Sequence, residues 1–250
     1  SNLAMIQSFY DRDRSPRRDL LPWSGEFPGK HLTASVLCFR LLPDPRLKEQ
    51  IELLVDLLAD VQDEDGYIGP HPKSERMTGK TVWESENPLW DVWGHYHAIL
   101  GLLYWYDESG SKIAFDTAIK AADCVCKRFL DTGDLISEAG DQFTNHAIVH
   151  AMCLLYQRTG NKRYLKMAEF VIKDWETPGS GDYYKTALDG IEFYQTPFPR
   201  WEPLHSIEAL PEMYYITGDD DYRRAFEHIW YSILKTDVHN TGAFSSNEQA

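Results

Sequence analysis

Trp90-Asp-Val-Trp-Gly-His-Tyr-His-Ala-Ile-Leu-Gly-Leu-Leu-Tyr-Trp-Tyr-Asp-Glu-Ser-Gly110 is the segment from which the fold of this chain is inferred. Polar and aromatic residues open it, an apolar run follows over residues 99–106, and a glycine ends it. A helix that is apolar almost all round is normally buried inside a larger assembly. Backbone N–H groups at a helix N-terminus are unpaired and point outward, so the polar start is predicted to line a pocket. The alternative is a core helix that happens to begin with aromatic residues.

The same arrangement of a histidine, a turn and a second amphipathic segment recurs along the chain. Each histidine stands 13 or 14 residues before its turn. Self-similarity with a period of roughly 50–65 residues is typical of a helical array. Each unit is therefore predicted to be a helix–turn–helix with a histidine at the head of its first helix. The histidine and turn positions are His31 and Asp44, His97 and Gly110, His146 and Gly160, and His205 and Gly218.

Four consecutive helical hairpins with few strand signals predict an all-α fold, an (α/α)6 toroid of which about four hairpins are present. The first helix of each pair is expected to line the inside. Residues 1–28 and 236–250 are predicted to be irregular, and the long aromatic-rich segment 177–201 is predicted to be a functional loop. This loop, the histidines and the loop holding Tyr67 are expected to share one funnel. The predicted hairpins pair residues 30–42 with 46–61, 93–106 with 111–129, 143–159 with 162–175, and 203–217 with 221–235.

The composition excludes several classes of partner. With a net charge of −14, the chain has no basic stripe to neutralise phosphates, which argues against nucleic acid. No apolar run reaches about 18 residues, so no membrane partner is expected. The lack of a recognisable signal peptide and of any disulfide or zinc spacing among the four cysteines favours a reducing, cytoplasmic location. Aromatic residues make up 13% of the chain, and their flat apolar faces suit sugar rings.

Six short motifs, in their order and spacing, resemble one known family. They are His31-Leu-Thr-Ala-Ser, Gln62-Asp-Glu-Asp-Gly-Tyr-Ile-Gly, Gly94-His-Tyr-His-Ala-Ile-Leu-Gly-Leu, Asn145-His-Ala-Ile-Val-His-Ala, His205-Ser-Ile-Glu-Ala-Leu and Thr241-Gly-Ala-Phe-Ser-Ser-Asn-Glu-Gln. Together they look like the β-L-arabinofuranosidase-type glycoside hydrolases of family 127, over most of residues 25–250. The resemblance implies an (α/α)6 barrel followed by β-sandwich domains. Residues 1–250 are then a single barrel catalytic domain, truncated at its C-terminal side.

The resemblance also implies a chemistry and its residues. The expected substrates are L-arabinofuranosyl-type or related plant or glycoprotein glycans, cleaved with retention by a cysteine thiolate that three cysteines and a glutamate hold on zinc. A second glutamate is the general acid/base, and Glu248 stands at its position. Three histidines bind the furanose hydroxyls, and the matching residues are His97, His146 and His205, with His95 and His150 as alternatives to the first two.

The residue types agree with these roles. A neutral imidazole has one donor and one acceptor, which suits sugar hydroxyls. Trp90 and Trp201 are candidates for stacking on a sugar face, and Tyr67 is a third candidate for substrate contact. Glu248 needs a raised pKa to donate a proton, which burial beside a sugar supplies. The alternatives are core packing for the histidines and aromatic residues, and a solvated loop for Glu248.

The chain departs from the family pattern at its end. The zinc glutamate and cysteines of the family lie in motifs downstream of the Glu248 position, whereas this sequence ends at Ala250. Zinc is therefore expected in the complete enzyme, with no ligands recognisable here, and the 250-residue chain alone is expected to be inactive. Either the chain is a fragment of a longer protein, or the sequence stops early.

Two other functions remain open at this point. One is another α/α-barrel carbohydrate enzyme, such as an unsaturated uronyl hydrolase acting through Asp91. A carboxylate pair formed by Asp91 and Glu202 would instead support ordinary two-carboxylate glycosidase chemistry. The other is a non-catalytic, carbohydrate-binding toroid. In each case an open arc of four hairpins exposes apolar faces, so self-association into a homo-oligomer is expected.

Overall fold

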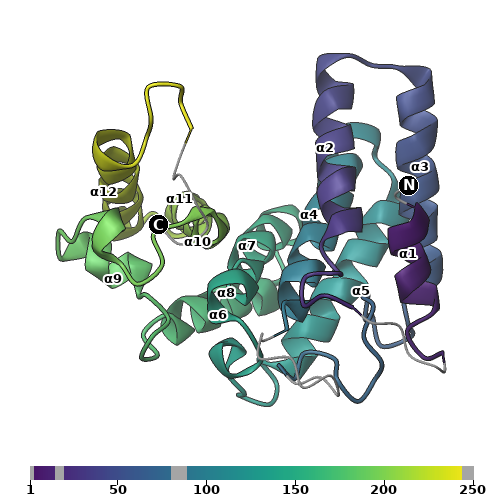
Figure 1. Cartoon of the computed structure of the whole chain (residues 1–250), viewed down its shortest axis with the longest axis horizontal. Helices are drawn as coiled ribbons and strands as arrows, with labels where there is room; N and C mark the ends of the chain where they lie inside the picture. Colours follow the sequence, from purple (N-terminus) through teal and green to yellow (C-terminus); the bar gives the residue numbers. More distant parts are fainter. Residues whose placement is uncertain (1–2, 15–19, 80–88, 244–250) are drawn as a thin grey trace. The chain divides into compact units, whose positions relative to one another are not determined.

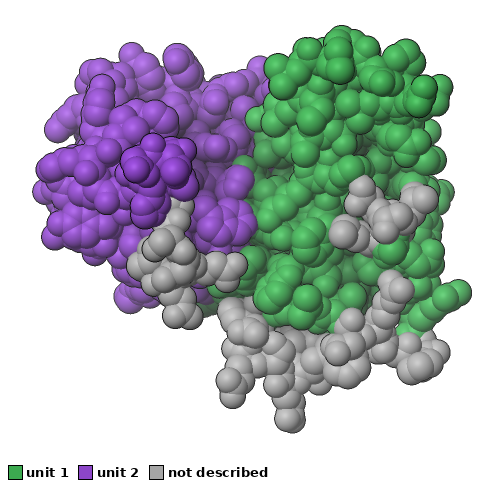
Figure 2. Space-filling model, turned by 45° about the horizontal axis from the view of Figure 1, so that its top comes forward, with its two compact units in different colours: residues 1–134, 138–141 green, residues 135–137, 142–250 purple. Residues whose placement is uncertain are grey.

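The computed structural model of the chain describes residues 3–14, 20–79 and 89–243, and the regular elements in these ranges are all helices (Figure 1). None of the described helices is both long enough and apolar enough to cross a membrane. The chain divides into two compact units, which Figure 2 shows in different colours. Unit 1 holds residues 1–134 and 138–141, and unit 2 holds residues 135–137 and 142–250.

Unit 1 contains a short N-terminal helix and two helical hairpins. Asp44 begins the second helix of the first hairpin by accepting a hydrogen bond from the Arg46 N–H at 2.7 Å. Pro45 follows at the first helical position, where no N–H is needed. Ser111 begins the second helix of the other hairpin by accepting from the Ala114 N–H at 3.3 Å. The helices are α1 (Leu3–Tyr10), α2 (Phe27–Leu41), α3 (Pro45–Val61), α4 (Asp91–Ser109) and α5 (Lys112–Arg128).

The backbones of α2 and α4 approach each other at glycines. A Cβ atom added to Gly29 would lie 2.3 Å from the carbonyl carbon of His97. One added to Gly101 would lie 3.0 Å from the carbonyl oxygen of Gly29. A side chain at Gly29 would therefore push the two helices apart. The close packing of α2 on α4, which positions the first half of α4, depends on this glycine.

Unit 2 contains the other two hairpins and the segment between them. α7 pairs with α8, and α10 with α11 forms a two-part helix that precedes α12. The elements are η1 (Ile136–Glu138), which begins in this unit, α6 (Gln142–Asn145), α7 (Ile148–Thr159), α8 (Lys162–Asp174), α9 (Tyr183–Leu188), η2 (Phe193–Gln195), α10 (Trp201–Ile207), α11 (Ala209–Thr217) and α12 (Asp220–Thr236).

The all-α fold class is confirmed, and each of the four predicted hairpins is present. Three of the predicted turns share one geometry. Gly110, Gly160 and Gly218 have φ angles of 71°, 66° and 74°, and each donates its N–H to the carbonyl four residues earlier. This left-handed helix end favours glycine, which explains why the sequence predicts the positions of these turns.

Two segments predicted to be irregular contain helices. The lead-in holds α1, and the 177–201 segment holds α9 and η2. Each is at most eight residues long, which is too short for a clear helical periodicity in the sequence.

Two helices predicted to be continuous are interrupted. The first helix of the third hairpin breaks at residues 146–147, where the N–H groups of Val149 and His150 bond to carbonyls three residues back. The first helix of the fourth hairpin breaks at Glu208. Pro211 explains this second break, because it has no N–H for the Ile207 carbonyl and its ring crowds that carbonyl.

Candidate functional site

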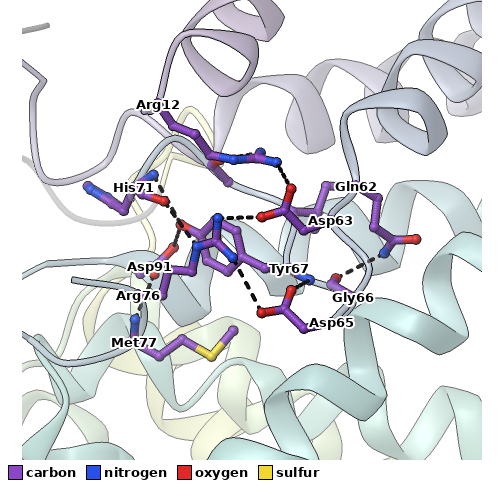
Figure 3. A network of polar contacts seen from close by, with 12 residues as sticks. Arg12, Gln62, Asp63, Asp65, Gly66, Tyr67, His71, Arg76, Met77 and Asp91 are labelled. Atoms are coloured by element: carbon purple, nitrogen blue, oxygen red, sulfur yellow. Dashed lines mark hydrogen bonds and ion pairs between the residues drawn. The ribbon is translucent and has the colours of Figure 1, made fainter. Parts of the chain in front are cut away.

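A buried polar network surrounds the start of α4 in unit 1 (Figure 3). The Asp91 carboxylate accepts hydrogen bonds from the Tyr67 hydroxyl at 2.9 Å and from the Met77 N–H at 2.8 Å. Asp91 is 3% exposed, and the positive end of the α4 dipole favours its charge. Since each of its oxygens already accepts a hydrogen bond from the protein, Asp91 gives no support to hydration chemistry at this position.

Tyr67 lies inside this network. Its side chain is 0% exposed, and its hydroxyl oxygen accepts a hydrogen bond from the His71 N–H at 3.2 Å. The Arg76 guanidinium lies over its ring, 4.1 Å from Cζ to the ring centre. Burial raises the pKa of Tyr67 well above its ordinary value, and the Asp91 charge raises the pKa further. Tyr67 therefore stays protonated, and its hydroxyl donates a hydrogen bond to Asp91.

His95 has a defined tautomer in the same network. Its Nε2 accepts from the Ile68 N–H at 3.2 Å, so its proton is on Nδ1, which lies 3.1 Å from the Asp91 carbonyl oxygen. Burial lowers the pKa of His95 and favours this neutral form. Both ring nitrogens of His95 are thus occupied by the protein itself, which favours His97 over His95 as a sugar ligand.

Ion pairs and a tight turn fix the segment that directly follows α3, next to this network. Arg12 and Arg76 both form ion pairs with Asp63. Burial tends to raise the pKa of Asp63, but the two guanidinium groups outweigh burial and lower the pKa below its ordinary value. Gly66 makes the sharp turn of the loop at φ 91°, where an added Cβ would lie 2.1 Å from the Lys120 carbonyl oxygen. The Gln62–Gly69 motif therefore supports the start of α4.

His97 and Trp90 lie at the same end of α4. His97, in the second turn, is 3% exposed and meets Trp93 edge to face, with 4.3 Å between the ring centres. Trp93 donates its Nε1–H to the buried carboxylate of Glu26. Trp90 immediately precedes the helix, is partly exposed, and lies 5.5 Å from the Trp23 ring.

In unit 2, His146 lies in the break between α6 and α7. Its Nε2 is 3.0 Å from Oδ2 of Asp174, at the end of α8. Asp174 also accepts hydrogen bonds from the Ser137 N–H at 2.9 Å, the Ser137 hydroxyl at 2.6 Å and the Thr177 hydroxyl at 3.0 Å. Burial tends to raise the pKa of Asp174, but hydrogen bonds from His146 and Ser137 outweigh burial and lower the pKa to about 2. Asp174 is therefore a buried, ionised carboxylate.

Two further predicted residues lie nearby on α10. The rings of Trp201 and His205 are 5.9 Å apart, and both side chains are partly exposed. At the next break, the Glu208 carboxylate lies 3.1 Å from Nδ1 of His150. Burial tends to raise the pKa of Glu208, but the hydrogen bond from His150 outweighs it and lowers the pKa. Of these three histidines of unit 2, His146 and His150 face carboxylates and His205 faces an indole.

The predicted site residues are divided between the two units. Glu248 lies outside the described residues, and the shared funnel, which involves both units, stays a prediction. Unit 1 holds Tyr67, Trp90 and His97, and unit 2 holds His146, Trp201 and His205.

Sequence reasoning missed Asp174. In α8 the buried residues Met167 and Val171 precede it by seven and three positions, which places Asp174 on the apolar face of the helix. A carboxylate on such a face needs hydrogen-bond donors from elsewhere in the fold. That was the signal available in the sequence, although it could not identify His146 as the partner.

The described part of the chain contains no group of three or more His, Cys, Asp or Glu side chains that suits a metal ion. Zinc binds cysteine as a thiolate. Burial raises the pKa of Cys124 to about 12 and also raises the pKa of Cys153, so both remain thiols. Since no further ligands are grouped beside them in the described part of the chain, these cysteines do not fit a zinc–thiolate centre.

Comparisons with known proteins identify relatives of the whole chain. The family described as "Beta-L-arabinofuranosidase, GH127 catalytic domain" matches residues 15–250. A Bifidobacterium longum protein named "Non-reducing end beta-L-arabinofuranosidase" is 30% identical over 233 residues. That match covers 82% of this chain but 34% of the relative.

Solved structures share the fold. A GH127 β-arabinofuranosidase, BT3674, matches with a TM-score of 0.65 and 22% identity, over 98% of this chain and 41% of that one. The Geobacillus stearothermophilus T6 GH127 β-L-arabinofuranosidase Ara127N matches with a TM-score of 0.69 and 18% identity, again over 98% and 41%. The chain therefore spans less than half the length of these relatives.

Proposed function

The chain belongs to the GH127 catalytic-domain family of β-L-arabinofuranosidases, and we propose that it is part of a glycoside hydrolase that removes L-arabinofuranose from glycans. The family match over residues 15–250 carries this proposal. The name of the Bifidobacterium relative supports a terminal β-L-arabinofuranosyl group as the substrate. As part of the same proposal, residues 1–250 form one (α/α) barrel domain whose C-terminal side lies in the remainder of the enzyme.

We assign substrate binding to histidine and tryptophan residues in or next to α4, α7 and α10. Imidazole nitrogens bind sugar hydroxyls, and the exposed parts of indole rings stack on sugar faces. Tyr67, which is fully buried, contributes by holding Asp91 at the start of α4. The proposed sugar-binding residues are His97, His146, His205, Trp90 and Trp201.

The proposed reaction proceeds with retention, and Glu248 is the general acid/base. The nucleophilic thiolate and its zinc belong to the remainder of the complete enzyme, since the thiols of the described residues do not fit that centre. Zinc would supply a stabilised cysteine thiolate at neutral pH. The part of the chain described here would bind and orient the sugar.

Glu248→Gln in the complete protein tests this function. Hydrolysis is expected to fall about 10²–10⁴-fold, which is the usual contribution of a positioned general acid/base. The loss in the glycosylation step should be larger for methyl β-L-arabinofuranoside than for the p-nitrophenyl glycoside, because a poor leaving group needs the proton more. Steady-state and burst kinetics on the two substrates measure both effects.

The control for this experiment is Glu64→Gln, which changes an exposed loop glutamate. Its activity should match that of the wild type. Full activity of Glu248→Gln would remove Glu248 from the mechanism. A wild-type enzyme that cleaves neither arabinofuranoside would overturn the proposed substrate.

A further inference from the structure

The hydrogen bonds of Asp174 determine where the proton of His146 lies. Oδ1 accepts from the hydroxyls of Ser137 and Thr177, and Oδ2 accepts from the Ser137 N–H and faces Nε2 of His146. An ionised carboxylate has no proton to donate, so the nitrogen that bonds to it must carry the hydrogen. Neutral His146 therefore has its proton on Nε2.

This tautomer leaves Nδ1 of His146 as an acceptor. Within the described part of the chain, the His146 ring forms its hydrogen bond with Asp174 through Nε2. His95 is different, because both its nitrogens bond to the protein. His146 thus has an acceptor nitrogen for a partner that carries a proton.

The partner that fits such an acceptor is a hydroxyl group. A carboxylate or phosphate oxygen has only lone pairs to present, and it would meet the lone pair of Nδ1. A neutral sugar has several hydroxyls that can donate. An acceptor at Nδ1 therefore suits a sugar hydroxyl and disfavours a carboxylate or phosphate oxygen at the same point.

We propose that Asp174 is a positioning residue that holds His146 with its proton on Nε2, so that Nδ1 accepts a hydrogen bond from a sugar hydroxyl. The role of His146 in sugar binding rests on the proposed function. The tautomer does not, because it follows from the contacts of Asp174. Ser137 fixes the orientation of the carboxylate, because its N–H bonds to Oδ2 and its hydroxyl bonds to Oδ1, whereas Thr177 adds one further donor to Oδ1.

The tautomer is measured directly by ¹⁵N NMR of the complete protein labelled at histidine, with the His146 signals assigned from a His146→Gln sample. Spectra recorded over a series of pH values identify the neutral ring, in which Nε2 should be protonated and Nδ1 should be bare in the wild type. Asp174→Asn introduces an amide that can turn its NH₂ group toward Nε2, so the proton should move to Nδ1. The wild-type spectrum decides the tautomer even if the variant fails to fold.

The functional consequence is measured by kinetics on p-nitrophenyl β-L-arabinofuranoside. Asp174→Asn should raise KM roughly 10- to 100-fold, as expected when a buried hydrogen bond is replaced by a mismatched one. The value of kcat should change less than KM, because His146 binds the sugar and takes no part in proton transfer. Thr177→Val is the matched control, since it removes one donor to Asp174 but keeps the charge and the contact with His146. Its tautomer should be unchanged and its KM should stay within about threefold.

Each outcome supports or overturns a defined part of the proposal. A wild-type His146 whose neutral ring is protonated on Nδ1 would overturn the assigned tautomer. A changed tautomer in Asp174→Asn with an unchanged KM would overturn the contact between Nδ1 and the sugar. An inactive wild type would overturn both the sugar contact and the proposed function, whereas the role of Asp174 would still be decided by the spectrum.

Discussion

Residues of the candidate site differ in whether their hydrogen bonds within the protein leave a donor or acceptor atom for a ligand. Tyr67, Asp91 and His95 bond to one another and to the adjacent loop, so they stabilise the start of α4. His146 bonds to Asp174 through one nitrogen and retains the other as an acceptor. Histidines that look equivalent in the sequence therefore have different roles, which depend on the groups packed against them.

Tyr67→Phe tests the buried network. The change leaves Asp91 without one donor and the His71 N–H without its acceptor, so the free energy of unfolding should fall by about 1–3 kcal/mol. Urea unfolding followed by tryptophan fluorescence measures the loss. The control is Tyr10→Phe, whose hydroxyl bonds to Asp60 on the surface and whose loss should stay within about 0.5 kcal/mol. Equal effects of the two substitutions would contradict the buried role.

Asp174 predicts a pH dependence of stability. Its pKa is about 2 in the folded chain against an ordinary value of 3.8, so its contribution is present above 3.8 and is lost as the pH falls toward 2. The contribution at neutral pH is roughly 2 kcal/mol. The difference in unfolding free energy between wild type and Asp174→Asn should therefore shrink as the pH falls through this window. Urea unfolding at a series of pH values tests it, and a constant difference would count against the depressed pKa.

Helices in this chain are limited by local breakers and by close contacts. Pro211 divides α10 from α11, and left-handed glycines end three helices where the sequence predicted turns. Gly29 acts differently, because it lies inside α2 and allows the α4 backbone to approach. Its effect depends on the partner helix.

Gly29→Ala distinguishes helix propensity from helix packing. Propensity alone predicts a gain of about 0.5–1 kcal/mol for alanine in α2. The added Cβ would lie 2.3 Å and 2.4 Å from backbone atoms of His97 and Ala98, so we expect a net loss of about 1–3 kcal/mol. Thermal unfolding measures the sign. The control is Ala34→Gly, which measures the effect of helix propensity alone at an exposed position of α2. A Gly29→Ala variant that is more stable than the wild type would contradict the close approach of α2 and α4.

The chain as a whole exposes apolar surface on unit 2. A groove of about 330 Å³ is lined by residues of α10 and α12, among them Leu204, Ile207 and Phe226. Trp230 and Leu234 also line the groove, and they are 52% and 50% exposed. Exposed apolar patches of this kind promote association.

The 250-residue chain on its own should self-associate through this groove. The double variant Trp230→Glu and Leu234→Glu should lower the mass measured by light scattering, because it places two charges at the groove. Lys112→Glu is the control, since it changes the net charge by the same two units at a position 83% exposed. A wild-type chain that stays monomeric would contradict the prediction.

Local patterns were sufficient for the all-α class, the four hairpins and their glycine turns. Each of these depends on residues within about four positions of one another: a cap, a left-handed glycine or an apolar stripe. The family motifs likewise lie in short stretches, and the family was confirmed over residues 15–250.

Packing between distant segments was needed for the remaining features. Asp174 is 28 residues from His146, and Tyr67 is 24 residues from Asp91. These residues meet only when helices and loops far apart in the sequence pack together, and no local sequence pattern predicts such a contact. This is why the sequence could single out the histidines as candidates, whereas the fold determined which nitrogen of His146 bonds to Asp174.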